Sequence, residues 1–347
     1  MITTSSIVAT LRQPPAGSAY RIGPDSCRSA FRAGDATVRE MPRAGPARQT
    51  ALVQASSVSR AVAAAFVRLV QGAPARWVDA LARGVAAMAY ALGIRRRVTL
   101  DNLAAALPER TDAERKAIAR GAYANMARTV VDSLRSIGDS REELRTRVEV
   151  DDFTLVERLL SRGQGLLCAT AHLGSWELFG ASMAQWVPLH AVVRPLKGGF
   201  NAQLVEARQR SGLGLIAPRG ALLGTVAALR RNEVVAMLID QAIGGKHSLF
   251  VPFFGRPAAT TPALSMAALR TGAPTVVAAA LRDGGRLRLH VEGPFEAEDT
   301  GHRERDLLAH TEKVTAALER LIRAHPEQWL WLHRRWKLRP PDAASVG

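Results

Sequence analysis

The sequence is poor in cysteine, lysine and aromatic residues. Among its 347 residues, cysteine occurs only at positions 27 and 168, lysine occurs five times, and aromatic residues make up 5%. Two cysteines provide neither a disulfide framework nor the ligand spacing of a metal site, which is typical of a protein in a reducing compartment. With few aromatic residues and no basic-aromatic motif, nucleic acid is a poor candidate partner. We therefore predict no metal site and no nucleic-acid partner.

The chain also lacks a long uncharged apolar run. Apolar residues are 47% of the sequence, which suffices for a large core. However, Arg68, Arg76, Asp79 and Arg83 interrupt the Ala-, Val- and Leu-rich segment 60–93. No uncharged stretch there approaches the ~18 residues needed to span a bilayer. We also find no secretory signal with a continuous apolar region.

Positively charged residues outnumber negatively charged ones. The sequence has 47 Lys+Arg against 31 Asp+Glu, a formal net charge of +16. Such an excess predicts anionic partners, namely an acidic protein or the headgroups of phospholipid or lipopolysaccharide.

Three regions of the sequence differ in composition and in their apolar pattern. Residues 1–55 are rich in Arg, Ala, Pro, Ser and Gly without apolar periodicity, and we interpret them as a disordered extension or a start site placed too early. Residues 56–145 are predicted to be a helical, membrane-associating region, in which Thr111 and Glu114 have the spacing of a helix-capping box. Residues 146–340 are predicted to form an α/β domain that continues from these helices.

Within residues 77–93, apolar residues fall on one side of a predicted helix, and this pattern has two interpretations. The helix either packs on its own domain or lies in a membrane interface with arginines at the headgroups. These residues are Trp77, Leu81, Val85, Met88, Ala89 and Leu92.

The α/β prediction rests on the alternation of predicted strands and helices along the chain. Short apolar runs predict strands at 165–171, 189–195, 213–218 and 234–240. The segments between them, notably 175–186, 200–211 and 220–231, predict helices. This order predicts a mostly parallel mixed sheet flanked by helices. A "DGG" turn within 274–294 predicts a hairpin, and 303–324 predicts a late amphipathic helix.

Two ionisable residues stand where burial should begin, in "CATAHLGSWELFG" at 168–180. His172 follows a predicted strand, and Glu177 comes five residues later. On a straight helix these side chains would point ~140° apart, so they can meet only if His172 lies on the preceding loop. Gly174, with Ser175 as a candidate N-cap, would allow such a turn. The alternatives are a catalytic dyad, or a buried histidine and an unrelated surface glutamate.

Other site chemistries are disfavoured by the same sequence. No second histidine or carboxylate stands at metal-ligand spacing nearby, and no G-x-S-x-G nucleophile elbow occurs. In the catalytic alternative, one imidazole nitrogen takes a proton from an attacking hydroxyl and acts as a general base.

Four blocks in this order resemble one known family. "TAHLGSWEL" (170–178) resembles the His-x4-Glu/Asp block of glycerolipid-type acyltransferases, and best the lauroyl/myristoyl acyltransferases of lipid A biosynthesis. The segments 192–216, 238–277 and 325–340 resemble further blocks of that family. Upstream, 95–115 resembles its N-terminal helical region. The chain departs from the family in its charge-interrupted N-terminal helix and in residues 1–50, which have no counterpart.

The resemblance implies an activity. Members of this family move a fatty acyl chain from an acyl-carrier-protein thioester to a hydroxyl of a lipid A precursor, without a cofactor. It implies His172 as the base and Glu177 as the carboxylate that orients it. The implied partners are acyl carrier protein, an anionic lipid A precursor and the membrane surface. The implied location is the cytoplasmic face of the inner membrane, through peripheral association or a single-helix anchor.

Further residues are candidates for the site. For the oxyanion, the backbone N–H groups of Gly174 and Ser175 are candidates, because they precede a helix. The family carries a functional arginine on the helix that holds Arg208 and Arg210, so these two side chains are candidates for stabilising the oxyanion. Arg194 follows a strand end and is a candidate for the same role. For all three arginines the alternative is a solvated face.

The remaining candidates follow the resemblance. Asp240 and Gln241 are expected to line the acceptor site, with a loop cap as the alternative. Phe253 and Gly255 of "VPFFG" are expected to line the acyl and headgroup crevice, with core packing as the alternative. In "PEQWLWLHRRWK" (326–337), tryptophans beside cations suit either a membrane interface or a final strand packed on the sheet.

Two other functions stay open at this point. One is a related acyltransferase that acts on another glycolipid or a lipoamino acid. The other is a catalytically silent, membrane-binding protein with the same fold, which would have no need of both His172 and Glu177.

Overall fold

The structure is a computed structural model, and it describes residues 57–193, 200–244 and 248–340. Its first part consists of helices. The predictions for residues 1–55 and for Arg194 lie outside these ranges. The first helices are α2 (Ser57–Gly72), α3 (Ala75–Ala91), α4 (Arg96–Ala106), α5 (Asp112–Arg135), α6 (Arg141–Thr146) and α7 (Thr154–Leu160). At the start of α5 the predicted capping box is confirmed, because the Thr111 side chain accepts from the Glu114 amide and the Glu114 carboxylate accepts from the Thr111 amide.

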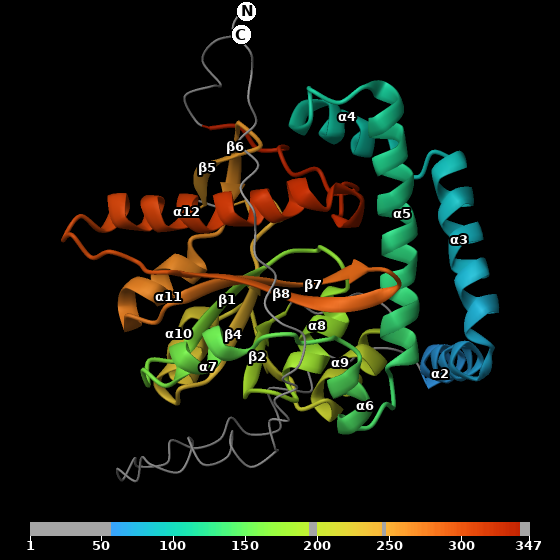
Figure 1. Cartoon of the computed structure of the whole chain (residues 1–347), viewed down its shortest axis with the longest axis horizontal. Coiled ribbons are helices and arrows are strands. Elements are labelled where there is room, and N and C mark those ends of the chain that lie inside the picture. The colour runs from blue at the N-terminus through green and yellow to red at the C-terminus, as the bar shows by residue number, and fades with distance from the viewer. Residues whose placement is uncertain (1–56, 194–199, 245–247, 341–347) are drawn as a thin grey trace, which may run out of the picture. The chain divides into compact units, whose positions relative to one another are not determined.

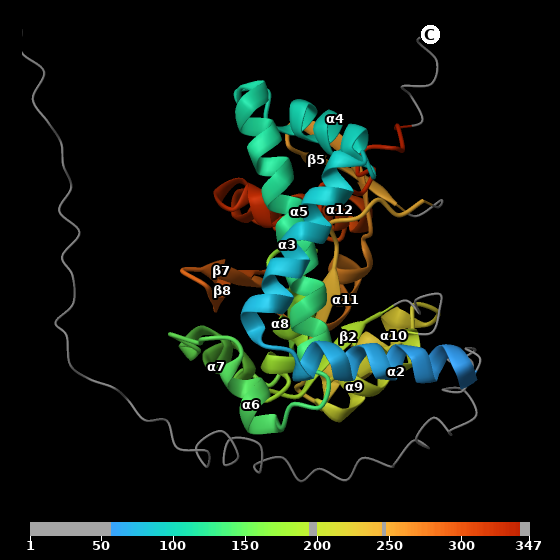
Figure 2. The same ribbon diagram turned by 90° about the vertical axis from the view of Figure 1, so that its right-hand side faces the viewer.

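The helix α3 packs along the long helix α5. In Figure 1, α3 (blue) lies on the outer side of α5 (green), and Figure 2 shows it in front of α5. The face of α3 that is buried carries Val78, Ala82 and Ala86, spaced four residues apart. Small residues at this spacing let the two helices approach closely.

A six-stranded sheet forms the second part, as the strand–helix alternation predicts. Its order is β3-β2-β4-β1-β7-β8. Every neighbouring pair is parallel except β7–β8. The strands are β1 (Leu166–Thr170), β2 (Leu189–Val192), β3 (Gly214–Ile216), β4 (Val234–Leu238), β7 (Thr275–Asp283) and β8 (Arg286–Phe295). The helices among them are α8 (Trp176–Met183), α9 (Phe200–Arg210), α10 (Ala221–Arg230), α11 (Ala263–Thr271) and α12 (Arg303–Ala324).

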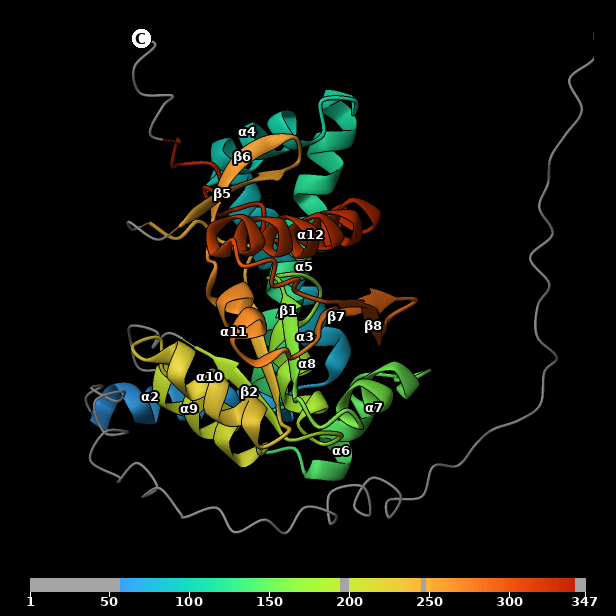
Figure 3. The ribbon, with the colours of Figure 1, turned by 90° about the vertical axis from the view of Figure 1, so that its left-hand side faces the viewer.

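The core lies on both faces of the central strand β1, all of which is buried. Leu167 and Ala169 pack with residues of α11 and α12, whereas Leu166 and Cys168 pack with residues of α7 and α8. Figure 3 shows α10 and α11 on one side of β1 and α7 on the other. Burial on both faces explains the continuous apolar sequence of this strand.

Two hairpins complete the fold. Gly284 and Gly285 have φ of 52° and 87°, so the predicted "DGG" turn joins β7 and β8 as a tight two-residue turn. The second hairpin, β5 (Leu249–Phe253) with β6 (Arg256–Thr260), turns at Phe254 and Gly255 with φ of 53° and 69°. The sequence patterns do not predict this hairpin, because a phenylalanine at positive φ is an unusual turn residue.

Among the described helices, none alone has both the length and the apolar composition of a membrane span. The pair α3 and α4 meets these criteria together, with a bend of 84° between them.

Candidate active site

His172 and Asp240 meet where two neighbouring parallel strands end. In the β1–β4 register Thr170 lies opposite Leu238, so the residues two positions beyond each strand also lie opposite each other. His172 Nδ1 lies 2.9 Å from Asp240 Oδ1, and the His172 backbone N–H donates to Oδ2 at 2.9 Å. Carboxyl ends of parallel strands are where open α/β sheets place their active crevice.

Asp240 is a buried and fully occupied acceptor. Its side chain is 2% exposed, and Trp329 Nε1–H donates to Oδ2 at 2.9 Å as a third hydrogen bond. Burial alone would raise the pKa of this carboxyl, but the charge and hydrogen bonds of His172 and the bond from Trp329 outweigh burial and hold the pKa below its usual range. Asp240 is therefore ionised at neutral pH.

An ionised Asp240 decides the tautomer of the imidazole. Nδ1 faces an acceptor and must carry the proton, which leaves the lone pair on Nε2. Burial lowers the pKa of His172, but the charge of Asp240, its hydrogen bond and the charge of Glu177 together raise the pKa above its ordinary value. The His172 side chain is 22% exposed. It is therefore a partly exposed imidazole of increased basicity whose unprotonated nitrogen is Nε2.

Glu177 does not orient the imidazole, contrary to the expected dyad. It lies in the first turn of α8 and pairs with Arg208 of α9. Arg208 Nε donates to Glu177 Oε2 at 3.0 Å, and its Nη2 donates to Oε1. This two-pronged pair uses both carboxylate oxygens. Asp240 takes the orienting position instead, and Glu177 acts on His172 through its charge.

Gly174 serves close packing rather than the meeting of His172 and Glu177. Its φ is +61°, and a Cβ there would lie 2.0 Å from the carbonyl oxygen of Ala280. The expected oxyanion role of this loop is not supported, because both candidate donors are already used. The Gly174 N–H donates to Gln328 O at 3.1 Å, and the Ser175 N–H donates to Ala280 O at 2.9 Å.

A polar stripe on α5, which the sequence-based predictions omit, holds the same loop. Asn125 Nδ2 and Thr129 Oγ1 donate to the Gly174 carbonyl at 3.0 and 2.9 Å. Arg282 of β7 donates to Asn125 Oδ1 at 2.8 Å and pairs with Asp132. The polar spacing 125, 129, 132 on one helix face is the signal that marks this stripe.

The structure separates the two candidate arginines of α9. Arg208 is mostly buried against Glu177, whereas Arg210 pairs with Glu206 on the solvent face of the same helix. The cavity beside Arg208 measures about 150 Å³, lies among α5, α6, α8 and α9, and has a wall of both polar and apolar residues. Its wall includes Ser133, Ser136, Asp139, Glu177, Arg208, Arg210 and Ser211.

Of the remaining predicted site residues, Gln241 lies beside His172, whereas Phe253 lies in the core and Gly255 at a turn. Gln241 Nε2 lies 3.3 Å from both ring nitrogens of His172, so its amide can donate to the unprotonated Nε2. Phe253 is fully buried, with its ring centroid 5.7 Å from that of Trp329, so in this structure it lines no crevice. Gly255 lies at an exposed turn, and a Cβ added there would have no neighbouring atom within 4 Å.

The C-terminal tryptophans are part of the core. Trp329 and Trp331 are 3% and 0% exposed, and a short 3-10 helix (Pro326–Gln328) precedes them instead of a strand. Arg335 is also buried, donating to Ala259 O and Thr260 Oγ1 of β6. For these three residues core packing replaces both expectations, whereas Arg334 and Lys337 of the same segment are exposed and Trp336 is half-buried.

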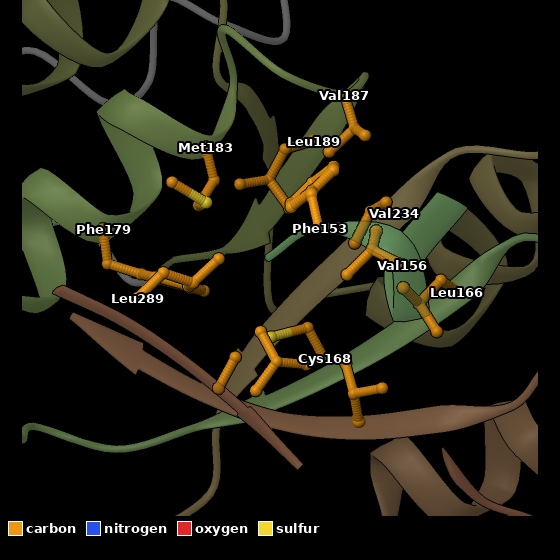
Figure 4. Close-up of a pocket in the computed structure, with 13 residues that line it drawn as sticks. Phe153, Val156, Leu166, Cys168, Phe179, Met183, Val187, Leu189, Val234 and Leu289 are labelled. Carbon is orange, nitrogen blue, oxygen red and sulfur yellow. The ribbon is translucent and has the colours of Figure 1, made fainter. Parts of the chain in front are cut away.

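An apolar cavity lies on the α7–α8 side of the sheet. Its lining includes Cys168 of β1 with Phe179 and Met183 of α8, all shown in Figure 4. Its volume of about 30 Å³ is roughly that of one water molecule. This volume excludes a long acyl chain. Burial raises the pKa of the Cys168 thiol to about 12, so the thiol is not a nucleophile at neutral pH.

The family profile described as bacterial lipid A biosynthesis acyltransferase matches residues 47–338. The chain belongs to this family. The matched range contains every residue of the site described above. The protein is therefore an acyltransferase of lipid A biosynthesis.

Individual relatives are similar over most of the chain. The lipid A palmitoleoyltransferase of Escherichia coli K12 is 29% identical over 260 residues, which cover 73% of this chain and 82% of that protein. The lauroyltransferase of the same strain is 27% identical and covers 72% and 82%. Its myristoyltransferase is 24% identical and covers 71% and 76%. The three names specify different acyl chains.

Proposed function

We propose that the protein transfers a fatty acyl chain from an acyl-carrier-protein thioester to a hydroxyl of a lipid A precursor, in lipopolysaccharide biosynthesis. One observation carries the proposal, namely the His172–Asp240 pair, which leaves His172 Nε2 unprotonated. Family membership supports the lipid A acceptor, since the relatives' names specify lipid A.

The reaction follows from the tautomer. The acceptor hydroxyl lies against Nε2, loses its proton to that nitrogen and attacks the thioester carbon. Asp240 stabilises the imidazolium that forms, because its charge faces Nδ1–H. The tetrahedral intermediate then expels the thiolate, which receives the proton from Nε2. The acyl chain never bonds to the enzyme, so neither a nucleophile nor a cofactor is needed.

Glu177 keeps a catalytic role in this proposal, in a changed form. Its charge raises the pKa of His172, which favours the imidazolium of the transition state. It also holds the guanidinium of Arg208 at the edge of the cavity among α5, α6, α8 and α9. We assign Arg208, rather than Arg210, as the arginine of the site, while Arg194, Gln241 and Gly255 remain candidate substrate contacts.

The partners and location follow from charge. A net charge of +16 favours the encounter with an acidic carrier protein and with a phosphorylated acceptor. We propose that the protein works at the cytoplasmic face of the inner membrane, where both substrates meet.

A purified His172→Ala variant tests the proposal. With acyl carrier protein loaded with a fatty acid and a lipid A precursor, it should lose transfer while still unfolding in one cooperative thermal transition, at a lower midpoint because the buried Asp240 loses its partner. His302→Ala is the matched control, since His302 is exposed at the start of α12. Transfer by His172→Ala at the wild-type rate would refute the mechanism.

The acceptor is tested separately. Mass spectrometry of lipid A from a deletion strain should show the loss of one acyl chain, and the mass difference gives its length. Unchanged lipid A would instead assign the enzyme to another glycolipid or a lipoamino acid.

A further inference from the structure

The reaction proposed above creates an oxyanion, and the site needs a hydrogen-bond donor for it. Attack of a hydroxyl on a thioester moves the carbonyl electron pair onto the carbonyl oxygen, which N–H or O–H groups must then stabilise. The backbone N–H groups of Gly174 and Ser175 already donate to other backbone carbonyls. Arg208 directs two of its nitrogens at the Glu177 carboxylate. Another donor beside His172 is therefore required.

The side chain of Gln241 lies beside the imidazole. Gln241 follows Asp240 after the end of β4, and its Nε2 is 3.3 Å from both ring nitrogens of His172. Because the charge of Asp240 keeps the proton on Nδ1, the ring nitrogen Nε2 can only accept a hydrogen bond. The group that Gln241 presents to it is therefore the NH₂ of its amide.

The position of this amide suits the geometry of the tetrahedral intermediate. The oxyanion and the attacking oxygen are bonded to the same carbon, and the attacking oxygen lies at hydrogen-bond distance from His172 Nε2. The oxyanion therefore lies within about 5 Å of that nitrogen. The terminal torsion of a glutamine is soft, so a rotation directs an N–H of Gln241 at the oxyanion. Gln241 is half-buried and the His172 side chain is 22% exposed, so a substrate can contact both.

The arrival of the acceptor releases the amide for this task. Before the reaction, the Gln241 amide faces His172 Nε2. The acceptor hydroxyl takes its place as the partner of Nε2, which leaves the N–H without an acceptor. The amide is also uncharged, whereas a cation at this position would lower the pKa of His172 and weaken the base.

We propose that the side-chain amide of Gln241 is a catalytic group that stabilises the oxyanion of acyl transfer. As the acceptor oxygen bonds to the thioester carbon, its proton passes to His172 Nε2 and the carbonyl electron pair moves to the oxygen that faces Gln241. When the C=O bond forms again, the C–S bond breaks and the leaving thiolate takes the proton from Nε2. The inference rests on the proposed acyl transfer and assigns Gln241 a role in its chemical step.

Steady-state kinetics of Gln241→Leu test the inference. Leucine has a similar size but no N–H group in its side chain. Removal of one oxyanion donor from a serine protease lowers kcat by about 10²–10³-fold. We expect a loss of about 10²-fold in kcat for Gln241→Leu, with KM little changed. Gln164→Leu is the matched control and should keep the wild-type kinetics, because Gln164 is exposed before the opposite end of β1.

The pH profile separates this role from one of holding the histidine. With Gln241→Leu, the acidic limb of kcat/KM should stay near its wild-type position, because Asp240 still faces Nδ1. Gln241→Glu keeps the shape of the side chain but adds a negative charge. This variant should lose at least as much kcat, and its acidic limb should move to higher pH, because a further carboxylate raises the pKa of His172. Both variants should unfold in one cooperative thermal transition.

Three outcomes would overturn the inference. The first is a Gln241→Leu variant that keeps more than about a tenth of the wild-type kcat. The second is a loss of rate that saturating acceptor restores, which would make Gln241 an acceptor contact alone. The third is an acidic limb that moves to lower pH in Gln241→Leu, which would make Gln241 a positioning residue for His172.

Failure of this inference is distinguishable from failure of the proposed function. A wild type that acylates the lipid A precursor, beside a Gln241→Leu variant that equals it, refutes the oxyanion role alone. If the wild type does not acylate the precursor, the proposed acceptor is wrong, and hydrolysis of the acyl thioester provides the same comparison. Water then replaces the hydroxyl, so Gln241→Leu should slow hydrolysis by about the same factor. An unchanged rate of hydrolysis would refute the oxyanion role.

Discussion

Replacement of Asp240 by asparagine should disable the base without altering the shape of the site. Asp240 Oδ2 faces two obligatory donors, the His172 backbone N–H and the indole N–H of Trp329. The amide oxygen of the asparagine must take this position, which directs its NH₂ group at His172 Nδ1. The imidazole then has to accept at Nδ1 and carry its proton on Nε2. In that tautomer, no lone pair faces the acceptor hydroxyl.

The magnitude follows from the lost tautomer and the lost charge. The equivalent change in serine proteases lowers kcat about 10⁴-fold for the same reason. For Asp240→Asn we expect a loss of about 10³–10⁴-fold in kcat, which corresponds to about 4–5.5 kcal/mol in the activation barrier. KM should change little, because Asp240 is buried beneath the histidine rather than exposed to substrate.

The pH profile separates this effect from a structural one. The base must be neutral, so kcat/KM rises with pH through the pKa of His172, which is raised above its ordinary 6.5. Without the charge of Asp240 this pKa falls, and the acidic limb of the remaining activity should shift to lower pH. The stability contributed by a raised histidine pKa is present below 6.5 and lost as pH rises through the folded pKa. Asp240→Asn should therefore cost more stability at about pH 5.5 than at about pH 9.

The assay is steady-state acyl transfer with a saturating thioester, beside urea unfolding at both pH values. Asp101→Asn on α4 is the control, since that carboxylate is 71% exposed. Retention of more than about a tenth of the wild-type kcat by Asp240→Asn would refute the orienting role.

Three further changes have expected outcomes. In urea titration, Gly174→Ala should lower the free energy of unfolding by more than about 2 kcal/mol, because φ is positive and the added Cβ would lie 2.0 Å from the Ala280 carbonyl oxygen. Gly255→Ala should lower it by only about 1 kcal/mol, because φ is +69° but the space around the added Cβ is open. Glu177→Gln and Arg208→Met should each slow transfer, and their combination should be less than additive in kcat, since they are bonded to each other. Additivity there would mean independent roles. Cys168 should resist iodoacetamide at neutral pH until the chain unfolds, and fast labelling of the native protein would contradict its burial.

The secondary structure was largely predictable because its signals are local. The capping box at Thr111, the "DGG" turn and the buried apolar runs each act over a few residues. The hairpin turning at Phe254 was missed, since positive φ at a phenylalanine is imposed by packing around it. For the same reason, the sequence left the environment of Trp329 and Trp331 open, and the structure places both in the core.

The site was predictable as a set of residues but not as a set of pairs. His172, Asp240 and Arg208 all stood out as strand exits or as members of a resemblance. The nearest carboxylate in sequence, Glu177, was the expected partner of the imidazole. The structure brings Asp240 there instead, from 68 positions away.

The sequence by itself therefore determined the elements, their order and the presence of a histidine at a strand end, since each depends on periodicity and turn chemistry within a short segment. Only the tertiary structure decided which carboxylate meets that histidine. The choice depends on β4 lying beside β1 in a register that sets Thr170 opposite Leu238. Strand order and register result from burial on both faces of the sheet, a property of the whole domain.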